Sequence, residues 1–431
     1  MEYIPVIILV LSFISLLLIG VPVAWSIAIS SLLTMLASIA ALPALTTVSQ
    51  RIATGLDSFA LLAIPFFVLS GQLMNKGGIA NRLIAFAKTL VGSLPGGLAL
   101  INIISAMLMG AIAGSAMASA SAMGSILGPE MEKEGYSKEF GAAVNITSST
   151  TGLIIPPSNV LIVYSLASGG VSIAALFLAG YIPGIITGLL LMIVAMFWAK
   201  KKKYKVGERS SMKQVASTFI SAFPSLMLLV VVIGGIVVGV FTATEASAIA
   251  VLYTLVLGFW YKEIKIKDLP QISLEACGTT AIVMLLIGAS MSMSWVMSYE
   301  NIPQGISDAL LGISNNPVII LLIINLILLF VGIFMDMTPA VLIFTPIFLP
   351  IVSEIGMDPV QFGIIMVLNL CIGLCTPPVG SVLFVGVGIA NTTIEKVVKP
   401  LLPLFFAMIV SLMLVSYFSE LSLWLPRIFG L

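Results

Sequence analysis

The sequence predicts an all-α polytopic membrane protein, built as an inverted repeat with two re-entrant helical hairpins and two broken helices. Its 431 residues are 60% hydrophobic and only 9% charged, which is typical of a chain with many membrane spans. Proline pairs interrupt two of the apolar segments. Lysine and arginine gather on alternate connecting segments. The composition excludes a soluble globular domain, and the other two observations give the repeat and the orientation.

The proline pairs mark two predicted helix breaks. The first lies in Gly152-Leu-Ile-Ile-Pro-Pro-Ser-Asn159 and the second in Gly373-Leu-Cys-Thr-Pro-Pro-Val-Gly380. Proline has no N–H to donate and its ring clashes with the preceding turn, so each helix must break there. Within a membrane, a break is tolerated only where it is buried in protein or lines a polar cavity. Two broken helices at corresponding places in two halves indicate the binding site of a transporter.

A constant offset of 221 residues indicates an internal duplication. It relates Pro156 and Pro157 to the second proline pair. The same offset carries Gly152 to Gly373, Pro129 to Pro350 and Gly135 to Gly356.

Apolar periodicity predicts the same order of elements in both halves. For the first half we expect spans at 4–19, 24–41 and 59–75, an interface helix at 79–91, a hairpin at 98–113 and 116–127, a broken helix at 140–168 and a long span at 173–199. For the second half we expect spans at 219–240, 246–260 and 276–297, an interface helix at 302–311, a hairpin at 318–334 and 340–351, a broken helix at 362–389 and a last span at 401–425.

The two breaks are expected to share one polar site, because a lone break in lipid leaves backbone groups unsatisfied at a cost of several kcal/mol. This predicts an elevator-type transport domain that moves as one body against a scaffold. The predicted division is scaffold and arm helices at 1–96, first hairpin and broken helix at 97–168, scaffold and arm helices at 169–315, second hairpin and broken helix at 316–390, and a C-terminal scaffold helix at 391–431.

The basic residues predict the orientation. Placing 200–213 in the cytoplasm puts 17 of the 19 lysines and arginines on that side and leaves Arg51 and Arg427 outside. Both termini then face outward, and the two halves are inverted. The first apolar segment is expected to be a retained membrane helix, because it continues directly into a second apolar run.

The residues around the breaks favour ion and anion binding. Unwound carbonyls are hard oxygen ligands that suit Na⁺, and helix N-termini suit a carboxylate. The small residues of the hairpin tip 110–121 and the polar run 145–151 are candidates, with helix packing as the alternative explanation. Asp336 is the one acid deep in a predicted membrane element, which indicates a functional site; the alternative is a helix cap.

Other chemistries are disfavoured. Without histidine the chain lacks the commonest zinc ligand and the usual proton relay. An intramembrane protease would need an aspartate pair, a serine with a base, or a metal, so we do not expect an enzyme. We expect Cys277, Cys371 and Cys375 to be core residues. A channel remains possible, although two broken helices favour a carrier. The net charge of +1 gives no indication of a nucleic-acid partner.

Five motifs stand out along the chain: Gly114-Ser-Ala-Met-Ala-Ser, 148–159, Phe241-Thr-Ala-Thr-Glu245-Ala, Gly332-Ile-Phe-Met-Asp336-Met-Thr-Pro339 and Leu374-Cys-Thr-Pro-Pro378. Together they resemble the large membrane subunit of the tripartite ATP-independent periplasmic (TRAP) transporters, of the DctM/SiaM type, and most of all its sialic-acid branch. The resemblance covers essentially the whole chain.

The resemblance implies sodium-coupled import of an organic acid across the bacterial inner membrane without ATP. It implies two partners: a small four-helix membrane subunit (DctQ/SiaQ type), expected as a separate chain, and a periplasmic substrate-binding protein (DctP/SiaP type). Both termini would be periplasmic. The expected substrate is sialic acid (N-acetylneuraminate). The alternatives are a C4-dicarboxylate or other carboxylate permease of this family, or a stand-alone Na⁺/anion symporter of the same superfamily.

The resemblance also implies at least two sodium sites and a substrate site. One sodium site would comprise Gly110, Ala113, Gly152, Ile155 and Pro156. The second would comprise Gly332, Gly373, Thr376 and Val379. Substrate would contact Ser115, Ser148, Ser149 and Asp336.

Overall fold

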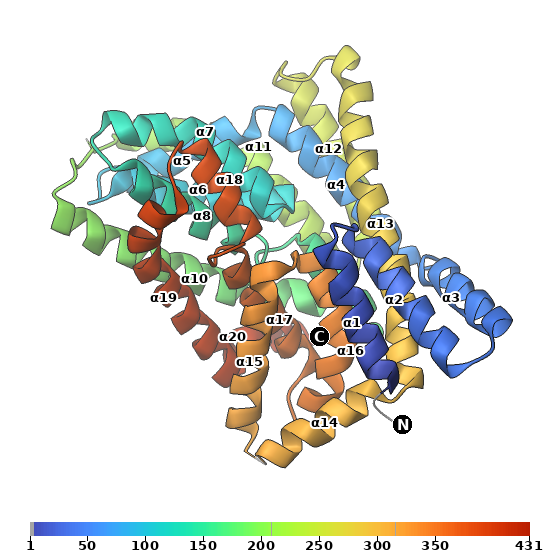
Figure 1. Ribbon diagram of the computed structural model, residues 1–431. Helices are drawn as coiled ribbons and strands as arrows, with labels where there is room; N and C mark the ends of the chain where they lie inside the picture. The colour runs from blue at the N-terminus through green and yellow to red at the C-terminus, as the bar shows by residue number, and fades with distance from the viewer. Residues whose placement is uncertain (1–3, 208, 315) are drawn as a thin grey trace.

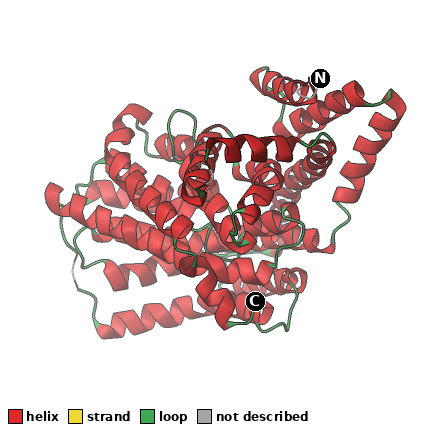
Figure 2. Ribbon diagram, turned by 90° about the horizontal axis from the view of Figure 1, so that it is seen from below, coloured by secondary structure: helices red, strands yellow, loops and turns green. Residues whose placement is uncertain are grey.

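The computed structural model describes residues 4–207, 209–314 and 316–431, without the side chains of Ala80, Ala111, Ile112, Ala113 and Leu311. The described residues form helices joined by short turns, with no strand among them (Figure 1, Figure 2). The first half contains α1 (Ile4–Leu18), α2 (Val23–Ser38), α3 (Ala41–Gly55), η1 (Phe59–Leu62), α4 (Ala63–Lys76), α5 (Ile79–Val91), α6 (Gly97–Ala113), α7 (Ala116–Lys133), α8 (Lys138–Thr151), α9 (Asn159–Ala167) and α10 (Ile173–Lys202). The second half contains α11 (Met212–Val237), α12 (Ala243–Trp260), η2 (Ile266–Asp268), α13 (Leu269–Tyr299), α14 (Ile302–Ile313), α15 (Pro317–Phe334), α16 (Met337–Glu354), α17 (Pro359–Leu374), α18 (Ser381–Ile389), α19 (Ile394–Tyr417) and α20 (Glu420–Ile428).

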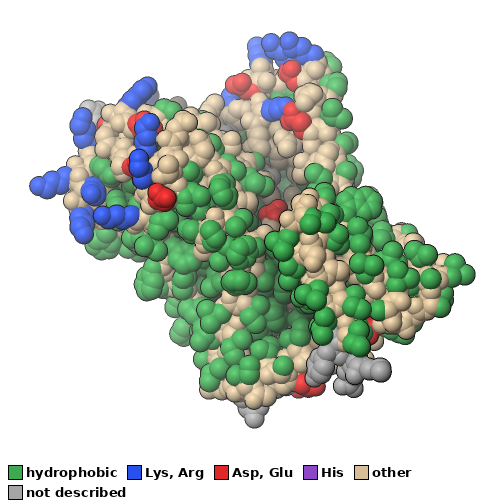
Figure 3. Space-filling model, in the orientation of Figure 1, with side chains coloured by type: hydrophobic (Ala, Val, Ile, Leu, Met, Phe, Trp, Pro, Cys, Tyr) green, Lys and Arg blue, Asp and Glu red, His purple; other side chains and the backbone are tan. Residues whose placement is uncertain are grey.

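The surface is that of a membrane protein. Eight helices in the described part of the chain are long and apolar enough to cross a membrane. Large apolar side chains such as Phe197, Val230 and Phe406 are more than 60% exposed, which is favourable only against lipid. Apolar side chains cover the body of the molecule in Figure 3, and lysine and arginine gather at two tips with a hollow between them.

The predicted inverted repeat of hairpins and broken helices is confirmed. Helices α6 and α7 form the first hairpin, which turns at Gly114–Ser115, and α15 and α16 form the second, which turns at Met335–Asp336. Both broken helices stop where the sequence predicts, leaving 152–158 between α8 and α9 and 375–380 between α17 and α18. The reason is local: neither proline pair can continue a helix.

The two halves meet at the broken helices. The Cys371 thiol of α17 donates to the carbonyl of Thr150 on α8 at 3.2 Å. These two residues are equivalent at the offset of 221, so the axis that relates the halves passes close to this contact. Cys375 donates in the same way to the carbonyl of Ile146 at 3.4 Å. Both cysteines are fully buried, as expected of core residues, whereas Cys277 is exposed.

Helix packing divides the molecule differently from the sequence-based division in one respect. Helix α13 packs against α2, α3 and α4, α12 packs against α4 and α11, and α1 packs against α2. Helices α10 and α19, which the sequence assigned to the scaffold, instead pack against the broken helix α8 and against α17. Small residues allow this. Gly180 and Gly184 of α10 lie so close to the first break that a side chain at either position would clash with it.

The two interface helices connect these groups. Helix α5 packs against both α6 and α11, and α14 packs against both α16 and α13. Each contact to a hairpin includes a carboxylate: Lys88 of α5 pairs with Glu130 of α7, and Ser307 of α14 donates to Glu354 of α16.

The prediction of a last span at 401–425 was wrong in extent. Helix α19 ends at Tyr417, Phe418 is extended, and α20 begins at an acidic residue that suits a helix N-terminus.

Candidate functional site

A cavity of about 230 Å³ lies where the two hairpin tips, the two breaks and the scaffold helices α4 and α13 meet. The first tip contributes 114–118 and the second contributes 336–338. Helix α9 contributes Asn159, and α18 contributes Ser381. The structure therefore brings together elements from both halves of the repeat around one polar space, as the two breaks require.

The first tip is neutral and capped. Ser115 is the N-cap of α7, and its hydroxyl oxygen accepts a hydrogen bond from the Ala118 N–H at 3.3 Å. Gly114 precedes it with φ of 61°, in the left-handed region that favours glycine. A Cβ atom at Gly114 would also lie 2.7 Å from the Asn159 amide nitrogen. The tip can therefore pack closely on the start of α9 only because a glycine stands there.

The second tip carries a carboxylate that does not cap its helix. Asp336 occupies the N-cap position of α16, but its side chain makes no capping hydrogen bond. It faces the cavity instead and is the one charged side chain among the described residues that line it. The alternative explanation, a helix cap, therefore accounts for the location of Asp336 at the start of α16. It does not account for the carboxylate, which faces the cavity.

The four N-termini of α7, α9, α16 and α18 converge on this cavity, since the first residues of each or their caps line it. Helix N-termini carry free N–H groups and a positive dipole end, which bind carboxylates and phosphates. The described residues that line the cavity include no lysine or arginine. Recognition of an anion here would rest on backbone dipoles and hydroxyl groups.

Two amides of α4 were missed by the sequence interpretation. Gln72 and Asn75 line the cavity from the scaffold side, and the Asn75 side-chain oxygen has no hydrogen-bond partner among the described residues. Their spacing of three places them on one helix face. Two amides so spaced in an otherwise apolar segment were the signal that could have identified them.

The predicted sodium residues form two clusters of backbone. Gly110 and Gly152 touch so closely that a Cβ on Gly152 would lie 2.3 Å from the Gly110 Cα. Gly332 and Gly373 are paired in the same way, at 2.5 Å. Each glycine pair joins the first helix of a hairpin to the end of a broken helix. In both halves, carbonyl groups of the two elements can approach one ion only because neither residue has a side chain.

The carbonyl oxygens of the predicted sodium residues differ in whether they already accept a hydrogen bond. No hydrogen bond to the carbonyls of Gly152, Ile155 or Pro156 is present among the described residues. The Gly110 carbonyl accepts the Gly114 N–H at 3.0 Å, and the Gly373 carbonyl accepts the Thr376 N–H at 2.9 Å. A carbonyl oxygen has a second lone pair, so these two oxygens can still contact an ion.

Three further residues were predicted to bind sodium: Thr376, Val379 and Ala113. The Thr376 hydroxyl donates to the Ile372 carbonyl at 2.7 Å, which leaves its oxygen lone pairs free. Val379 is 40% exposed in the second break. Ala113 ends α6, and its side chain lies outside the described residues.

Two of the predicted substrate residues do not reach the cavity. Ser148 is fully buried and its hydroxyl donates to the Asn102 side-chain oxygen of α6 at 3.1 Å. Ser149 is fully buried and its hydroxyl donates to the Asn145 carbonyl one turn earlier at 2.6 Å. Of the four predicted substrate residues, the structure places Ser115 and Asp336 at the cavity.

This combination of re-entrant hairpins, broken helices and a shared central cavity defines a secondary-transporter permease. The family model of the tripartite ATP-independent periplasmic transporter, DctM component, matches residues 10–421. The chain belongs to this family of transporter permeases, and it is not an enzyme. Its members work with a small membrane subunit and a periplasmic binding protein.

Several relatives cover nearly the whole chain. It is 56% identical over 430 residues to the uncharacterized protein YgiK of Salmonella typhimurium, covering 100% of this chain and 99% of that one. It is 40% identical to an isethionate TRAP transporter permease, DctMQ, of Oleidesulfovibrio alaskensis, covering 95% of this chain and 64% of the relative. It is 38% identical to the sialic acid TRAP transporter large permease SiaM of Vibrio cholerae, covering 88% and 89%.

A solved structure supports the fold. The YdaH transporter of Alcanivorax borkumensis aligns with a TM-score of 0.68 over 88% of this chain and 89% of that one. The two sequences are 13% identical, so this likeness bears on architecture alone.

Proposed function

We propose that this chain is the permease through which a sodium gradient drives import of an organic carboxylate. The observation that carries the proposal is the cavity at which four helix N-termini converge, flanked by two glycine-paired clusters of carbonyl oxygens. The N-termini suit the anion, and the neutral oxygens suit Na⁺.

Asp336 gives a physical reason why binding of the anion would be coupled to binding of Na⁺. A carboxylate substrate in the cavity would lie near the Asp336 carboxylate, and like charges about 4 Å apart repel by roughly 4 kcal/mol at an effective dielectric constant of 20. Sodium ions bound at Gly332–Gly373 and at Gly110–Gly152 offset that repulsion. The anion then binds well only when the cations are in place, which is what coupled transport requires.

The substrate has two candidates. Sialic acid is the expectation from the sequence, and one relative named for sialic acid supports it. The cavity favours the second, a smaller carboxylate or sulfonate: its volume of about 230 Å³ is less than that of sites for larger ligands, which span roughly 300–1,000 Å³. A relative named for isethionate agrees with that choice. A nine-carbon sugar acid would require the tips to move away from α4.

We further propose that the chain lies in the bacterial inner membrane with its basic segments in the cytoplasm and both termini in the periplasm, working with a small four-helix subunit and a soluble binding protein. The exposed lysines of 200–205 and of 262–267 lie at the termini of long helices and fit this orientation. Transport would proceed by displacement of the hairpins and broken helices as one body, together with α10 and α19, which pack on them.

The direct test is uptake of labelled substrate into proteoliposomes that hold this chain with its small subunit, with the binding protein added outside. We expect uptake to follow an inward Na⁺ gradient, to fail with K⁺, and to ignore ATP. Thr376→Ala should raise the Na⁺ concentration for half-maximal uptake several-fold. A panel of sialic acid, a C4-dicarboxylate and isethionate identifies the substrate. Equal uptake with K⁺ would rule out the sodium coupling, and uptake without the binding protein would indicate a stand-alone symporter.

A further inference from the structure

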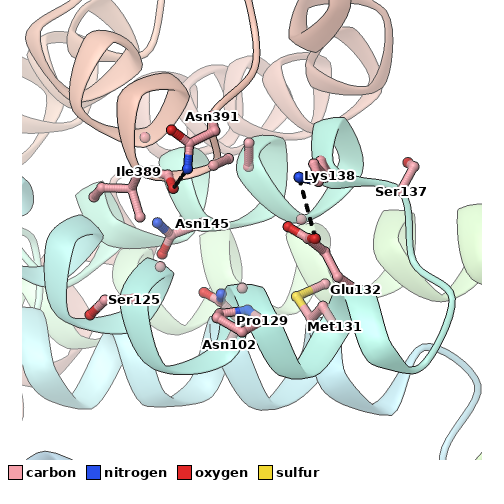
Figure 4. A pocket seen from close by; sticks show the side chains of 16 residues that line it. Asn102, Ser125, Pro129, Met131, Glu132, Ser137, Lys138, Asn145, Ile389 and Asn391 are labelled. Atoms are coloured by element: carbon pink, nitrogen blue, oxygen red, sulfur yellow. Dashed lines mark hydrogen bonds and ion pairs between the residues drawn. The ribbon is translucent and has the colours of Figure 1, made fainter.

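A second cavity of about 240 Å³ lies apart from the first, between α7, α8 and α18 (Figure 4). Its mouth carries the exposed ion pair of Lys138 with Glu132, whose atoms are 3.4 Å apart. It is therefore at the same end of the molecule as Lys133 and Lys138, the end that the basic residues assign to the cytoplasm. The proposed function gives this cavity no role.

The inner end of this cavity is lined by amides. Asn145 is 3% exposed and Asn102 is 1% exposed. The Asn145 nitrogen donates to the Ala120 carbonyl at 2.7 Å, and because a carbonyl only accepts, the amide must have this orientation. Its oxygen, by contrast, has no hydrogen-bond partner among the described residues. Figure 4 shows both amides on the cavity wall, beside Ser125 and Asn391.

Polar groups continue from this cavity toward the first glycine pair. Asn102 accepts from Ser148, which stands one turn before Gly152 on α8. Ser105 stands one turn beyond Asn102 on α6, is fully buried, and has a hydroxyl without a partner among the described residues. The adjacent carbonyl of Ala106 lies 2.9 Å from the Cβ position of Gly152. The column of oxygens thus ends at the Gly110–Gly152 contact.

The second half places its buried polar side chains differently: Asn369 of α17 donates to Asn325 of α15 at 2.6 Å, and Asn325 donates to Ser416 of α19 at 3.1 Å. At the offset of 221, Asn145 corresponds to Met366, and at the offset of 222 that relates Gly110 to Gly332 in the hairpins, Ser105 corresponds to Ile327. At the positions of Asn145 and Ser105, the first half has polar atoms without a partner among the described residues where its repeat has apolar side chains. Polar atoms inside a helix bundle that make no interhelical hydrogen bond do not serve helix packing and are free to contact an ion.

We infer that the cavity at Asn145 is the cytoplasmic mouth of a narrow route between α6 and α8, through which sodium exchanges with the Gly110–Gly152 site. The oxygens of Asn145, Asn102 and Ser105 replace part of the hydration shell of the ion as it passes. The inference rests on the proposed sodium coupling and adds that this ion leaves through the hairpin body, separately from the substrate cavity.

The test uses Ag⁺, a monovalent cation that displaces the proton of a thiol to form a silver thiolate. Ser105→Cys and Asn145→Cys are made in a chain whose three native cysteines are replaced, and Ile327→Cys and Met366→Cys are the matched controls from the repeat. The full chain with its small subunit is exposed from the cytoplasmic side in inside-out vesicles, in nitrate salts. Unreacted thiols are then counted after denaturation.

We expect silver to modify the two first-half thiols at least about tenfold faster than their repeat equivalents, which corresponds to roughly 1.4 kcal/mol in access. Sodium nitrate should slow the reaction at Ser105→Cys several-fold, and choline nitrate should not. Equal rates at all four positions, or a rate at Ser105→Cys that ignores sodium, would overturn the route. Ser119→Cys, on the buried face of α7, is the substitute probe if Ser105→Cys does not insert.

Uptake by the unmodified assembled transporter, measured in parallel, separates the two proposals. Sodium-dependent uptake with unreactive seam thiols means that the route is wrong and the coupling stands. Sodium-independent uptake means that the coupling itself is wrong.

Discussion

The two hairpin tips share one backbone plan and carry different chemistry. At the first tip, Ser115 caps α7 with a 3.3 Å hydrogen bond and adds no charge. At the second, Asp336 takes the same N-cap position in α16, leaves the cap unmade, and presents its carboxylate to the cavity. The duplication therefore preserved the turn and the helix start, which are set by local backbone geometry. The side chain at the cavity was free to diverge.

The two breaks differ in the same sense. The first is buried throughout 152–156 and rests on α10, where Gly180 meets the carbonyl of Ile154. The second exposes Pro378 and Val379. The first half is thus the more tightly enclosed, and the second half is the more open and carries the charge. This asymmetry predicts that the two proposed sodium sites differ in access although both are framed by a pair of glycines.

The largest expected effect comes from crosslinking the hairpins, which we propose to move during transport, to the scaffold helices. Met117 at the first tip and Val68 of α4 line the same cavity. Helix α4 is therefore a suitable crosslinking partner for the tip. A disulfide between cysteines at these positions, with Cys277, Cys371 and Cys375 replaced, should abolish uptake, and reduction should restore it. Full uptake by completely crosslinked protein would exclude the elevator motion.

Adding one methyl group at each glycine pair should abolish most transport. A Cβ on Gly152 lies 2.3 Å from backbone and one on Gly373 lies 2.5 Å from backbone, so the helices must separate. Overpacking costs about 1–3 kcal/mol, and more where backbone must shift. We expect Gly152→Ala and Gly373→Ala to lose sodium-dependent uptake and to lower Tm.

The reciprocal variants sharpen the comparison of halves. A Cβ on Gly110 meets backbone at 2.5 Å and one on Gly332 at 3.0 Å, so Gly110→Ala should lower Tm more than Gly332→Ala. Gly278→Ala is the control, because its Cβ would meet nothing within 4 Å and alanine favours a helix by about 0.5–1 kcal/mol. Equal Tm changes at Gly110 and Gly332 would contradict the asymmetry.

Exchanging the residue at one tip should separate stability from transport. Asp336→Ser gives the second tip the residue of the first, and serine is as good an N-cap as aspartate, so Tm should change little. Uptake should fall at least about tenfold, which corresponds to a loss of roughly 1.4 kcal/mol. Asp308→Asn, on the exposed surface of α14, is the control for loss of a carboxylate. Normal uptake by an inserted Asp336→Ser chain would remove Asp336 from the site.

The smallest expected effect lies in the interface helices. Lys88 and Glu130 form an exposed ion pair between α5 and the first hairpin. Ser307 and Glu354 make the equivalent contact from α14 at 3.3 Å. Exposed pairs contribute about 0–1 kcal/mol. Lys88→Met should therefore shift Tm by a few degrees at most and its effect should fade with added salt, whereas Ser307→Ala should show no salt dependence. A large loss of uptake in either variant would mean that these contacts control transport.

The particular residues show how far sequence reasoning reaches here. Some sequence features determine the structure of the few residues around them. The breaks could therefore be predicted from the proline pairs, the first hairpin turn from its glycine, and the spans from the long apolar runs. Asp336 could be singled out because an acid in an apolar segment is costly wherever it lies. The motif resemblance then gave the family, which the comparisons confirm.

Other features were decided by packing between distant segments. Whether Ser148 faces a ligand or Asn102 depends on the rotation of α8 against α6, which no local pattern specifies. Whether α10 belongs with the scaffold or with the hairpins depends on which surface its glycines meet. The sequence by itself therefore determined where the backbone must break and which residues are costly to bury, because those are local properties of the chain. The tertiary structure alone decided which polar groups share a cavity, because that depends on contacts between helices far apart in sequence.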